Sequence, residues 1–535
     1  MTRFFLAVLV IAIFVSFFRL GSVTLFDVDE AVFSEATKEM VQSGNWITPT
    51  YNGENRYDKP ILFYWLMAVS YKIFGINEFS ARFPSALGGF ILCIAIFFFL
   101  REIIDEKTAF HAVLSLAFSI YFFAYAHSAV TDMVLTLFIT LSLFSFYLSV
   151  EKDRRYLYGF YIFSALALLT KGLIGIIFPF GIAVVYLLIR DGLKGIKSIF
   201  NLKASVLFLL IALPWYIAQI IINGDEFIQQ FLIKHHFKRY TGVISGHRGP
   251  IYYFIPAIII GMFPWIAFLP QGIKSALKTD DRRPMTDDRL SKFKIISPIH
   301  LFTHSPNLFA LIWFAFIFIF FSLSTTKLPN YILPAVPALS ILISSGMTYY
   351  GKRWSGLPYI IIAILSLLLG TGFFVLNGYV LRFGIRDTGW LNLLAIVMSG
   401  FMIVSLYALV RKRNSFGILS LLMAVFLFTL SIKALPVANE YLQGSLLRYS
   451  LMAKERLRDE GELITYGINA PSIVYYSGRY IKKFDNKENM LRYLRSSANP
   501  ERVVIISKAK DIEIFKDTGL ALLETDGRYV VLERK

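Results

Sequence analysis

Cysteine is almost absent from this chain, which has one, Cys93, in 535 residues. A single cysteine excludes an internal disulfide, so any exported part has to be stable without one. Charged residues are also scarce, at 17% of the chain, whereas 56% of the residues are hydrophobic and 16% are aromatic. Soluble domains carry about 25% charged residues, so the composition indicates a membrane protein.

The net charge of +18 would suit a nucleic-acid-binding protein, but the basic residues form neither a tail nor a continuous patch. They fall in short gaps between apolar runs, as the positive-inside rule expects of a membrane protein. We therefore expect no nucleic-acid partner. The first apolar run has no evident A-x-A cleavage site and is followed by many others, which predicts a retained helix instead of a signal peptide.

Apolar runs of membrane-spanning length recur along the chain and predict an all-α polytopic domain of about 13 transmembrane helices over residues 1–435. The runs lie at residues 4–20, 84–100, 108–126, 132–150, 156–170, 173–189, 204–222, 251–270, 307–323, 331–350, 357–377, 391–410 and 415–433.

Alternate connections between these runs are rich in lysine and arginine, as at residues 152–155, 190–197, 274–294, 352–353 and 411–413. Such loops are expected to be cytoplasmic, which places the long loops 21–83 and 223–250 outside the cytoplasmic membrane. Residues 436–535 also fall outside and are expected to form a small α/β domain. Strands are predicted at 462–468, 502–508 and 528–534, and amphipathic helices at 452–460 and 487–496.

Three carboxylates, Asp27, Asp29 and Glu30, follow directly after the first apolar run. Carboxylates at a membrane surface suit proton abstraction or metal binding, whereas in lipid they would be very costly. Residues 31–40 have an apolar face and a charged face, so this segment is predicted to lie in the interface plane. Further on, Lys59 could bind a phosphate at headgroup depth or could simply anchor the loop, and the loop alone favours neither.

Several blocks of this first loop then follow one another in a particular order. They are Asp29-Glu30-Ala31, Lys38-Glu39-Met40, Gly44-Asn45-Trp46, Asn52-Gly53 and Asp58-Lys59-Pro60. This order resembles the first outer loop of the GT-C glycosyltransferases, in the branch with the lipid A aminoarabinose transferase and the protein O-mannosyltransferases. That branch typically has D-E-A-R-Y, G-D-W, N-G and E-K-P-P-L-Y-Y-W.

Later blocks agree with the same branch, so that the resemblance covers roughly residues 20–350. They are residues 128–133, 170–172, 214–216, 235–240, 247–250 and 326–334. Each block alone would be weak, but the ordered set is specific. The resemblance implies a GT-C fold and the transfer of a sugar from a polyprenyl phosphate with inversion of the anomeric centre.

Two positions depart from the pattern. Val32 stands where the family usually has an arginine, which leaves the sugar and the acceptor open. Asp58 replaces the glutamate of E-K-P and keeps the charge on a shorter arm. Lipid A or a related envelope glycan is the acceptor that the resemblance favours, and we expect the protein to act as a monomer.

The expected site combines carboxylates with cations at the outer face. Asp29 is the first candidate for the base or acceptor-orienting group, followed by Asp132 and Glu30. The donor phosphate would be bound by Lys59, Lys171, Arg239, Lys327 and Tyr331. Asp132 and Lys171 lie at predicted helix ends, where a capping aspartate and an interfacial lysine are common alternatives.

A divalent metal is a weaker hypothesis, because Asp58, His235, His236 and His247 offer oxygen and nitrogen ligands without a fixed zinc-type spacing. His235 and His236 are adjacent, so both cannot point into one site from a regular element. Three other functions remain open, namely a protein O-mannosyltransferase-like enzyme, an oligosaccharyl ligase or polymerase, and a carrier or flippase of lipid-linked sugars. A carrier would place charges near the bilayer midplane, often in repeated halves.

Overall fold

The structure is a computed structural model that describes residues 2–231, 249–277, 305–352, 355–382, 388–458, 460–495, 502–516 and 518–534. The chain divides into two compact units. Unit 1 consists of Met1–Phe18, Asp58–Phe63 and Ser85–Ile432. Unit 2 consists of Arg19–Tyr57, Tyr64–Pro84 and Lys433–Lys535, so it combines much of the first long loop with the C-terminal residues.

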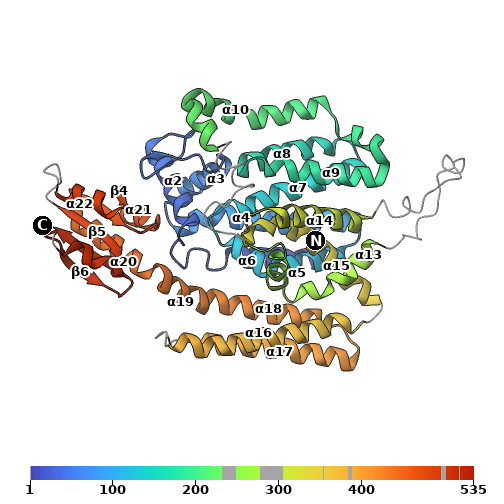
Figure 1. The fold of residues 1–535 in the computed structure, drawn as a ribbon. Helices are drawn as coiled ribbons and strands as arrows, with labels where there is room; N and C mark the ends of the chain where they lie inside the picture. Colours follow the sequence, from blue (N-terminus) through green and yellow to red (C-terminus); the bar gives the residue numbers. More distant parts are fainter. Residues whose placement is uncertain are drawn as a thin grey trace, which may run out of the picture. The chain divides into compact units, whose positions relative to one another are not determined.

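Unit 1 is built of helices (Figure 1). They are α1 (Arg3–Phe17), α5 (Glu106–Ala117), α6 (Ile120–Ala126), α7 (Asp132–Glu151), α8 (Tyr156–Lys171), α9 (Ile174–Asp191), η1 (Gly192–Ile199), α10 (Leu202–Phe227), α12 (Phe254–Gly261), η3 (Trp265–Phe268), α13 (Leu269–Ala276), α14 (Pro306–Leu323), η5 (Pro329–Ala335), α15 (Val336–Lys352), α16 (Leu357–Arg382), α17 (Gly389–Arg411) and α18 (Phe416–Thr429). Helices α3 (Leu62–Phe74) and α4 (Glu78–Ile103) have residues in both units.

Every predicted apolar run coincides with one of these helices or with a bent pair of them. Among the described residues, nine helices are long and apolar enough to cross a membrane, or eleven if each of two bent pairs is one span. Three further apolar helices, α1, α3 and α8, are shorter. The multi-pass membrane architecture is therefore confirmed, while the number 13 stays a prediction.

The bent pair α5 and α6 turns by 65° at a break that the sequence encodes. The hydroxyl of Ser119 accepts a hydrogen bond from the Phe122 N–H and so caps α6. The carbonyl of Phe118, which the break removes from the helix ladder, accepts instead from the indole N–H of Trp265 at 2.8 Å. Both groups freed by the bend are thus satisfied inside the bundle, as a low-dielectric interior requires.

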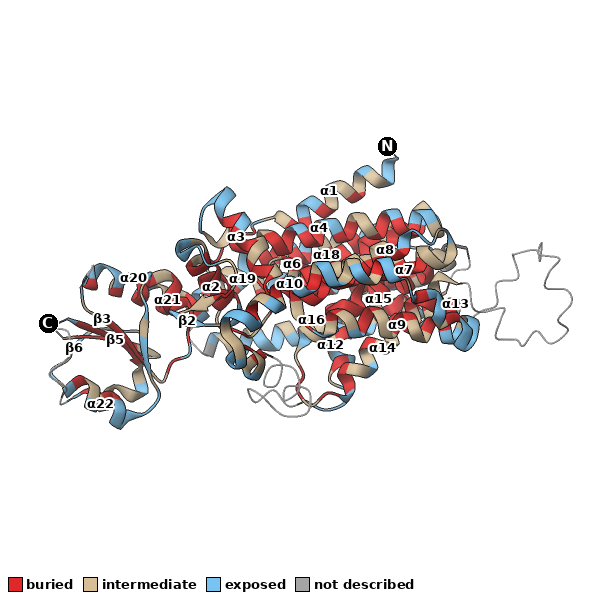
Figure 2. Ribbon diagram, turned by 90° about the horizontal axis from the view of Figure 1, so that it is seen from above, coloured by how far each residue is buried: buried red, intermediate tan, exposed pale blue. Residues whose placement is uncertain are grey.

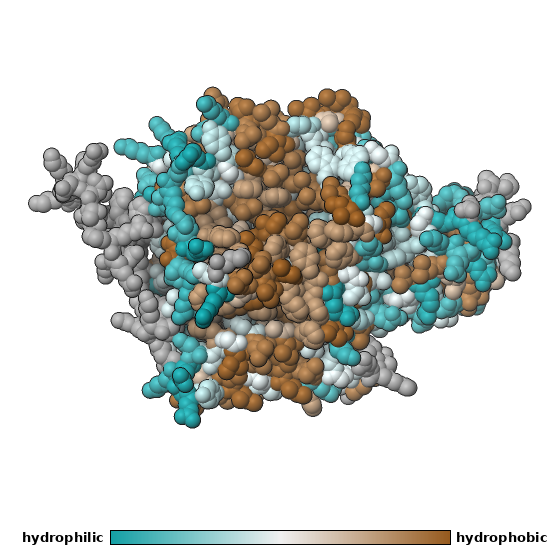
Figure 3. All heavy atoms as spheres, turned by 180° about the vertical axis from the view of Figure 1, so that it is seen from behind, coloured by the Kyte–Doolittle hydropathy of each residue, from teal (hydrophilic) through white to brown (hydrophobic). Residues whose placement is uncertain are grey.

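The outside of unit 1 is apolar. Its packed interior contains most of the buried residues (Figure 2), yet large apolar side chains on α10, α16 and α17 remain exposed, such as Leu210, Leu368 and Val410. Figure 3 shows that such side chains form a broad band over the helices and that hydrophilic residues gather at its edges. Water would penalise a surface of this kind, whereas lipid chains suit it.

The C-terminal part of unit 2 contains a five-stranded mixed sheet in the order β4-β3-β5-β7-β6. The strands are β3 (Glu462–Tyr466), β4 (Ile481–Phe484), β5 (Val503–Lys508), β6 (Ala521–Thr525) and β7 (Tyr529–Arg534). Side chains alternate along β5, so that Val504 and Ile506 pack under α20 (Ser445–Leu457), while Val503 and Ile505 face α22 (Lys487–Arg495). The predicted strands and helices of the C-terminal residues are thus present, while the bounds 436–535 and a location outside the membrane stay predictions.

The first loop contributes α2 (Asp29–Ser43) and a hairpin of β1 (Thr50–Tyr51) and β2 (Glu54–Asn55) to the same unit. The turn residues Asn52 and Gly53 both have positive φ, which an Asn-Gly pair tolerates well. Glu39 of α2 holds this turn, because its carboxylate accepts hydrogen bonds from the backbone N–H of Asn52 at 2.7 Å and the hydroxyl of Thr50 at 2.6 Å.

Helix α2 therefore differs from the predicted interfacial helix. Its apolar face is buried as expected, but Glu30, Glu35 and Glu39 on the charged face are buried as well. Each of these carboxylates has a polar partner within unit 2. These three carboxylates therefore serve internal contacts, and the location of α2 at the membrane surface stays a prediction.

Polar contacts of Thr24, Leu25, Asp27, Lys38 and Asn52 join the first loop to the C-terminal residues within unit 2. The side-chain amide of Asn52 exchanges two hydrogen bonds with the backbone of Ile481, at 2.7 and 2.9 Å. Asp27 accepts from the backbone N–H of Ser472 at 2.8 Å and from its hydroxyl at 2.5 Å, at the start of α21 (Ser472–Ser477). Lys38 donates to the carbonyl of Tyr475 at 3.2 Å. The two distant parts of the sequence thus fold as one body.

Candidate functional site

Asp132 and Lys171 form a largely buried ion pair in unit 1. Asp132 is the first residue of α7 and Lys171 the last of α8, and these antiparallel neighbours bring the two helix ends together. The ammonium of Lys171 lies 2.7 Å from Asp132 Oδ1, and the two side chains are 13% and 5% exposed. An acidic group at a helix N-terminus and a basic group at a C-terminus also complement the helix dipoles.

Residues of η5 complete this cluster. The Asn330 side-chain amide donates to the same Oδ1 atom of Asp132 at 3.1 Å. The ring of Tyr331 lies 5.9 Å from the ammonium of Lys171, within cation–π range. The structure therefore brings together three predicted site residues, Asp132, Lys171 and Tyr331. We name them, with Asn330, the Lys171 cluster.

The ammonium of Lys171 has hydrogen-bond donors that the other residues of the cluster do not use. Its ammonium has three donor hydrogens, and within the described residues it makes one hydrogen bond, to Asp132. Asp132 does not act as a conventional helix cap, since no side-chain hydrogen bond caps the start of α7. The pair is thus better suited to positioning a cation than to ending a helix.

Lys327 is used differently. It is buried, and its ammonium donates to the backbone carbonyls of Ser322 at 2.9 Å, Phe321 at 3.4 Å and Ser324 at 2.5 Å. These carbonyls belong to the C-terminal end of α14, where a cation satisfies acceptors that the helix leaves open. Lys327 therefore holds the turn that leads into η5, the element that carries Asn330 and Tyr331.

Asp58 and Lys59 lie in the short segment that belongs to unit 1. Both are half-buried, and the Lys59 ammonium donates to the carbonyl of Asp58 at 3.1 Å. The turn that they form precedes α3, whose first residue is Leu62.

Asp29 is exposed at the first position of α2, in unit 2. No side-chain hydrogen bond caps this helix, whose N-cap residue is Val28. Asp29 also forms no hydrogen bond or ion pair with any described residue. Its carboxylate is therefore available, and helix capping does not account for it.

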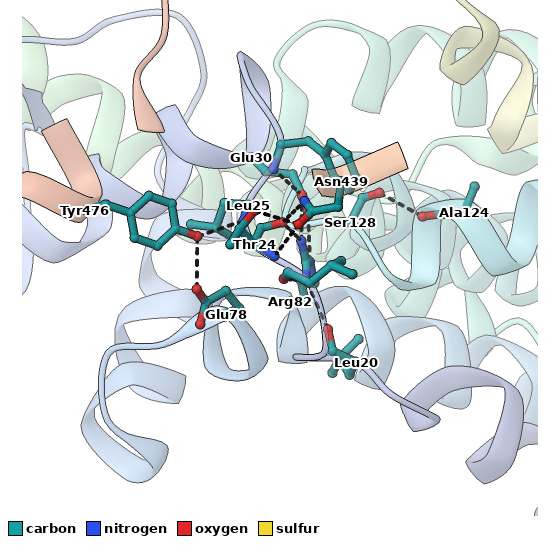
Figure 4. A network of polar contacts seen from close by, with 12 residues as sticks. Leu20, Thr24, Leu25, Glu30, Glu78, Arg82, Ala124, Ser128, Asn439 and Tyr476 are labelled. Carbon is teal, nitrogen blue, oxygen red and sulfur yellow. Dashed lines mark hydrogen bonds and ion pairs between the residues drawn. The ribbon is translucent and has the colours of Figure 1, made fainter. Parts of the chain in front are cut away.

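Glu30, the next residue, is committed to an internal network (Figure 4). The buried guanidinium of Arg82 donates to both oxygens of Glu30, from Nε at 3.0 Å and from Nη2 at 2.9 Å. Arg82 also donates to three carbonyls of the first loop, those of Leu20, Val23 and Thr24. Glu30 thus fixes the backbone that leads to Asp29, and its carboxylate is enclosed there.

Four predicted residues, Arg239, His235, His236 and His247, lie outside the described residues. The described part of the chain contains no group of three or more histidine, cysteine, aspartate or glutamate side chains placed to hold a metal ion. The proposed ligand set, with Asp58 as its described member, stays a prediction.

The fold resembles that of a solved membrane enzyme. The crystal structure of ArnT from Cupriavidus metallidurans bound to undecaprenyl phosphate superposes with a TM-score of 0.78 over 99% of this chain and 97% of that one, at 22% sequence identity. At 22% identity this likeness shows that the two proteins share a fold and carries no statement about function.

Sequence comparisons identify the family. Residues 58–217 match the family model described as dolichyl-phosphate-mannose-protein mannosyltransferase. An undecaprenyl phosphate-alpha-4-amino-4-deoxy-L-arabinose arabinosyl transferase of Shewanella sediminis is 29% identical over 66% of this chain and 62% of its own length. An uncharacterized protein of Aquifex aeolicus is 34% identical over 67% of this chain and 76% of its own length. The chain belongs to the GT-C glycosyltransferase superfamily.

Membership of this superfamily confirms the expectation drawn from the ordered sequence blocks. The chain spans less than two thirds of the length of several curated relatives that it matches. At the position of the usual superfamily arginine, Val32 is buried in α2, so no charge is presented there.

Two residues at or near the site were not predicted. Asn330 lies in the block of residues 326–334 that carries the predicted Lys327 and Tyr331, and its uncharged amide donates to Asp132. Asp27 was grouped with the surface carboxylates, yet burial raises its pKa from 3.8 to about 6, against hydrogen bonds from Ser472 that favour the charged form. The residue lies in the loop between α1 and α2.

The raised pKa of Asp27 predicts a pH-dependent stability. Between about pH 4 and pH 6 the unfolded chain ionises Asp27 before the folded chain does, so folded-state stability falls as pH rises, by up to about 3 kcal/mol. Asp27→Asn does not titrate. We expect the melting temperature of this variant, relative to wild type, to be higher at pH 7 than at pH 4.

Melting curves of the purified protein at both pH values would measure this difference. Glu54→Gln, which removes an exposed carboxylate of the same unit, is the control measured in parallel at both pH values. A melting-temperature difference between Asp27→Asn and wild type that is the same at both pH values would show that Asp27 has an ordinary pKa.

Proposed function

We propose that the protein is an inverting glycosyltransferase that moves a sugar from a polyprenyl-phosphate donor to an envelope acceptor. It would work at the outer face of the cytoplasmic membrane, with lipid A or a related glycan as the favoured acceptor. Family membership and the transferases among the relatives support the reaction class. The observation that carries the proposal is the Lys171 cluster. In it Asp132 holds the ammonium of Lys171 in place, and this ammonium has N–H donors that no described residue uses.

A donor of this kind places a phosphate at headgroup depth while its lipid chain stays in the bilayer. When the bond from the anomeric carbon to the phosphate oxygen breaks, negative charge builds up on the departing phosphate. A pre-positioned cation stabilises that charge more than it stabilises the intact donor, which lowers the barrier. Lys171 is our first candidate for this cation, because Asp132 and Asn330 fix its position.

The other residues predicted to bind the donor phosphate have different proposed roles. Lys59 and Arg239 would add positive charge, and the Tyr331 hydroxyl would donate a hydrogen bond to the phosphate. Lys327 spends its donors on backbone carbonyls, so we assign it to shaping the turn before Asn330 and Tyr331. Of the five residues predicted to bind the donor phosphate, Lys59, Lys171, Arg239 and Tyr331 then remain as proposed phosphate ligands.

Asp29 would act on the other reactant. As a base it would take the proton of an acceptor hydroxyl while the oxygen attacks the anomeric carbon. If the acceptor is an already ionised phosphate, no base is needed and Asp29 would orient the sugar instead. Its exposed carboxylate suits either role.

A reconstitution assay tests the proposal. Purified protein in liposomes would receive undecaprenyl-phosphate-linked aminoarabinose, with lipid A or an acceptor peptide in parallel vesicles. Transfer to lipid A, detected by mass spectrometry, is the expected product. Transfer to the peptide would instead indicate a protein glycosyltransferase, which the matching mannosyltransferase model suggests as the second candidate. Movement of the donor without a new product would indicate a carrier.

The same assay tests Lys171. Lys171→Ala should lower kcat/KM for the donor by more than tenfold, since a charge-assisted contact contributes about 1.5–3 kcal/mol. Lys152→Ala is the matched control, because Lys152 lies in the loop between α7 and α8, beyond the opposite ends of these helices. Melting temperatures of both variants separate a loss of activity from a loss of folding. Wild-type kcat/KM at normal stability would remove Lys171 from the donor site.

A further inference from the structure

A second polar site lies at the other end of the helices that carry the Lys171 cluster. A hollow of about 220 Å³ opens where α7 and α9 end and α8 begins. Its polar lining comes from Ser149, Arg154, Arg190, Asp191 and Ser198. Helix α7 has 20 residues, and at 1.5 Å per residue it separates this hollow from Asp132 by about 30 Å.

Arg190 enters the hollow with donors left over. Its Nη1 lies 3.2 Å from Glu151 and its Nε 3.8 Å from Asp191, but neither nitrogen makes a hydrogen bond in the described part of the chain. Arg154 is exposed, and its contact within the described residues is a long hydrogen bond of 3.4 Å to the carbonyl of Phe200. Guanidinium groups with unsatisfied donors are suited to a phosphate, whose oxygens they can bind in pairs.

The surrounding charge favours an anion as well. Residues 151–155 and 190–197 together carry six basic and three acidic side chains. Of the acidic ones, Glu151 faces Arg190, and Asp153 is paired with the exposed Arg155 at 2.7 Å. Asp191 is therefore the acidic residue among those that line the hollow, where two arginines accompany it.

The segment that supplies Ser198 to the hollow also carries exposed apolar side chains. Helix η1, which supplies Ser198, also carries Leu193, and Phe200 and Leu202 follow it. These three side chains are 79%, 68% and 81% exposed, next to Lys194 and Lys197. A short helix with apolar and basic side chains at the end of a transmembrane bundle is typical of the membrane interface, where acyl chains can cover the apolar part.

We propose that this hollow binds the phosphate headgroup of an anionic membrane lipid, at the face of the membrane opposite to the Lys171 cluster. Arg154 and Arg190 bind the phosphate oxygens, Ser198 lies beside them, and the acyl chains run along Leu193, Phe200 and Leu202. Basic pockets at the ends of transmembrane helices recognise anionic headgroups by this chemistry. The lipid would join α7, α8 and α9 at the end where loops connect them.

Neighbouring arginines allow a matched test. Arg154 lines the hollow, whereas Arg155 points into solvent and pairs with Asp153. The delipidated protein in detergent would be titrated with phosphatidylglycerol, phosphatidylcholine or inorganic phosphate, and bound lipid counted by native mass spectrometry. We expect phosphatidylglycerol to bind, with Arg154→Gln weakening it about tenfold and Arg155→Gln changing it less than twofold.

Three outcomes would overturn the proposal. Equal binding of phosphatidylcholine would show that the headgroup charge is not recognised. Equal losses in Arg154→Gln and Arg155→Gln would indicate general attraction to a basic loop. Binding of inorganic phosphate without binding of phosphatidylglycerol would assign the hollow to a soluble anion. Melting temperatures of both variants without lipid should equal that of wild type, which keeps the comparison valid.

Discussion

Asp29→Asn should lower sugar transfer by roughly 10²–10⁴-fold while the protein stays folded. Asparagine has the size of aspartate and much of its hydrogen-bonding capacity, but it lacks the negative charge and nearly all of the basicity. If Asp29 accepts a proton or stabilises positive charge on the sugar ring, this substitution removes the function and little else. Initial rates of transfer in proteoliposomes would measure the effect.

The position of Asp29 makes this test clean. Its side chain is exposed, does not cap α2 and has no partner among the described residues. Loss of its charge at the first turn of a helix costs about 0.3–1 kcal/mol through the helix dipole, too little to unfold the protein. Any large fall in transfer is therefore a direct effect on the reaction.

Glu54→Gln is the control, since Glu54 is another exposed carboxylate of the same unit. This variant should transfer sugar at the wild-type rate. If Asp29→Asn also remains within about twofold of wild type, Asp29 has no part in the reaction, and Asp132 would become the leading carboxylate.

Arg82→Gln should destabilise the protein by about 3–5 kcal/mol, the largest stability effect that we expect. Arg82 neutralises the buried carboxylate of Glu30 and binds three backbone carbonyls of the first loop. Glutamine removes the charge and most of the donors, so Glu30 is left buried without its cation. Thermal unfolding of the purified protein and protease cleavage within residues 19–30 would both report the change.

Two further variants separate the ion pair from the loss of a long side chain. Arg101→Gln, at the exposed far end of the same helix α4, should have no measurable effect. The double variant Glu30→Gln/Arg82→Gln should be less destabilised than the sum of the two single variants, because it leaves no unpaired charge. Additive losses would mean that Glu30 and Arg82 contribute independently.

The helices could be located from the sequence because apolar length is a local property. The run at 132–150, for example, needs nothing beyond its own residues to predict α7. Strands β4 and β6 were missed for a physical reason. Both lie at the edges of the sheet, where partial exposure removes the apolar alternation that predicts the inner strands. The sequence of β6, ALLET, contains no such pattern.

The candidate site was only partly accessible from the sequence. Asp132 and Lys171 were expected on one face because they stand at the ends of successive spans, and they do form a pair. The neighbours Asp29 and Glu30 looked equivalent, but the partner of Glu30 is 52 positions away in α4. Lys327 was interpreted as a phosphate ligand, and local sequence could not show that it turns back onto carbonyls of α14. The roles of Glu30 and Lys327 depend on tertiary contacts, which a local sequence pattern does not contain.

The two parts of unit 2 are far apart in the sequence, so the ribosome synthesises them at different times. Residues 19–84 leave the ribosome first, and their partners at 433–535 follow after roughly 350 further residues. Translation at about 5–20 residues per second makes this delay roughly 20–70 s. During this delay the contacts of Asp27 with Ser472, of Lys38 with Tyr475 and of Asn52 with Ile481 cannot form. A chain interrupted before residue 472 would contain every residue proposed for the reaction and still lack the contacts that Asp27, Lys38 and Asn52 make with the C-terminal residues.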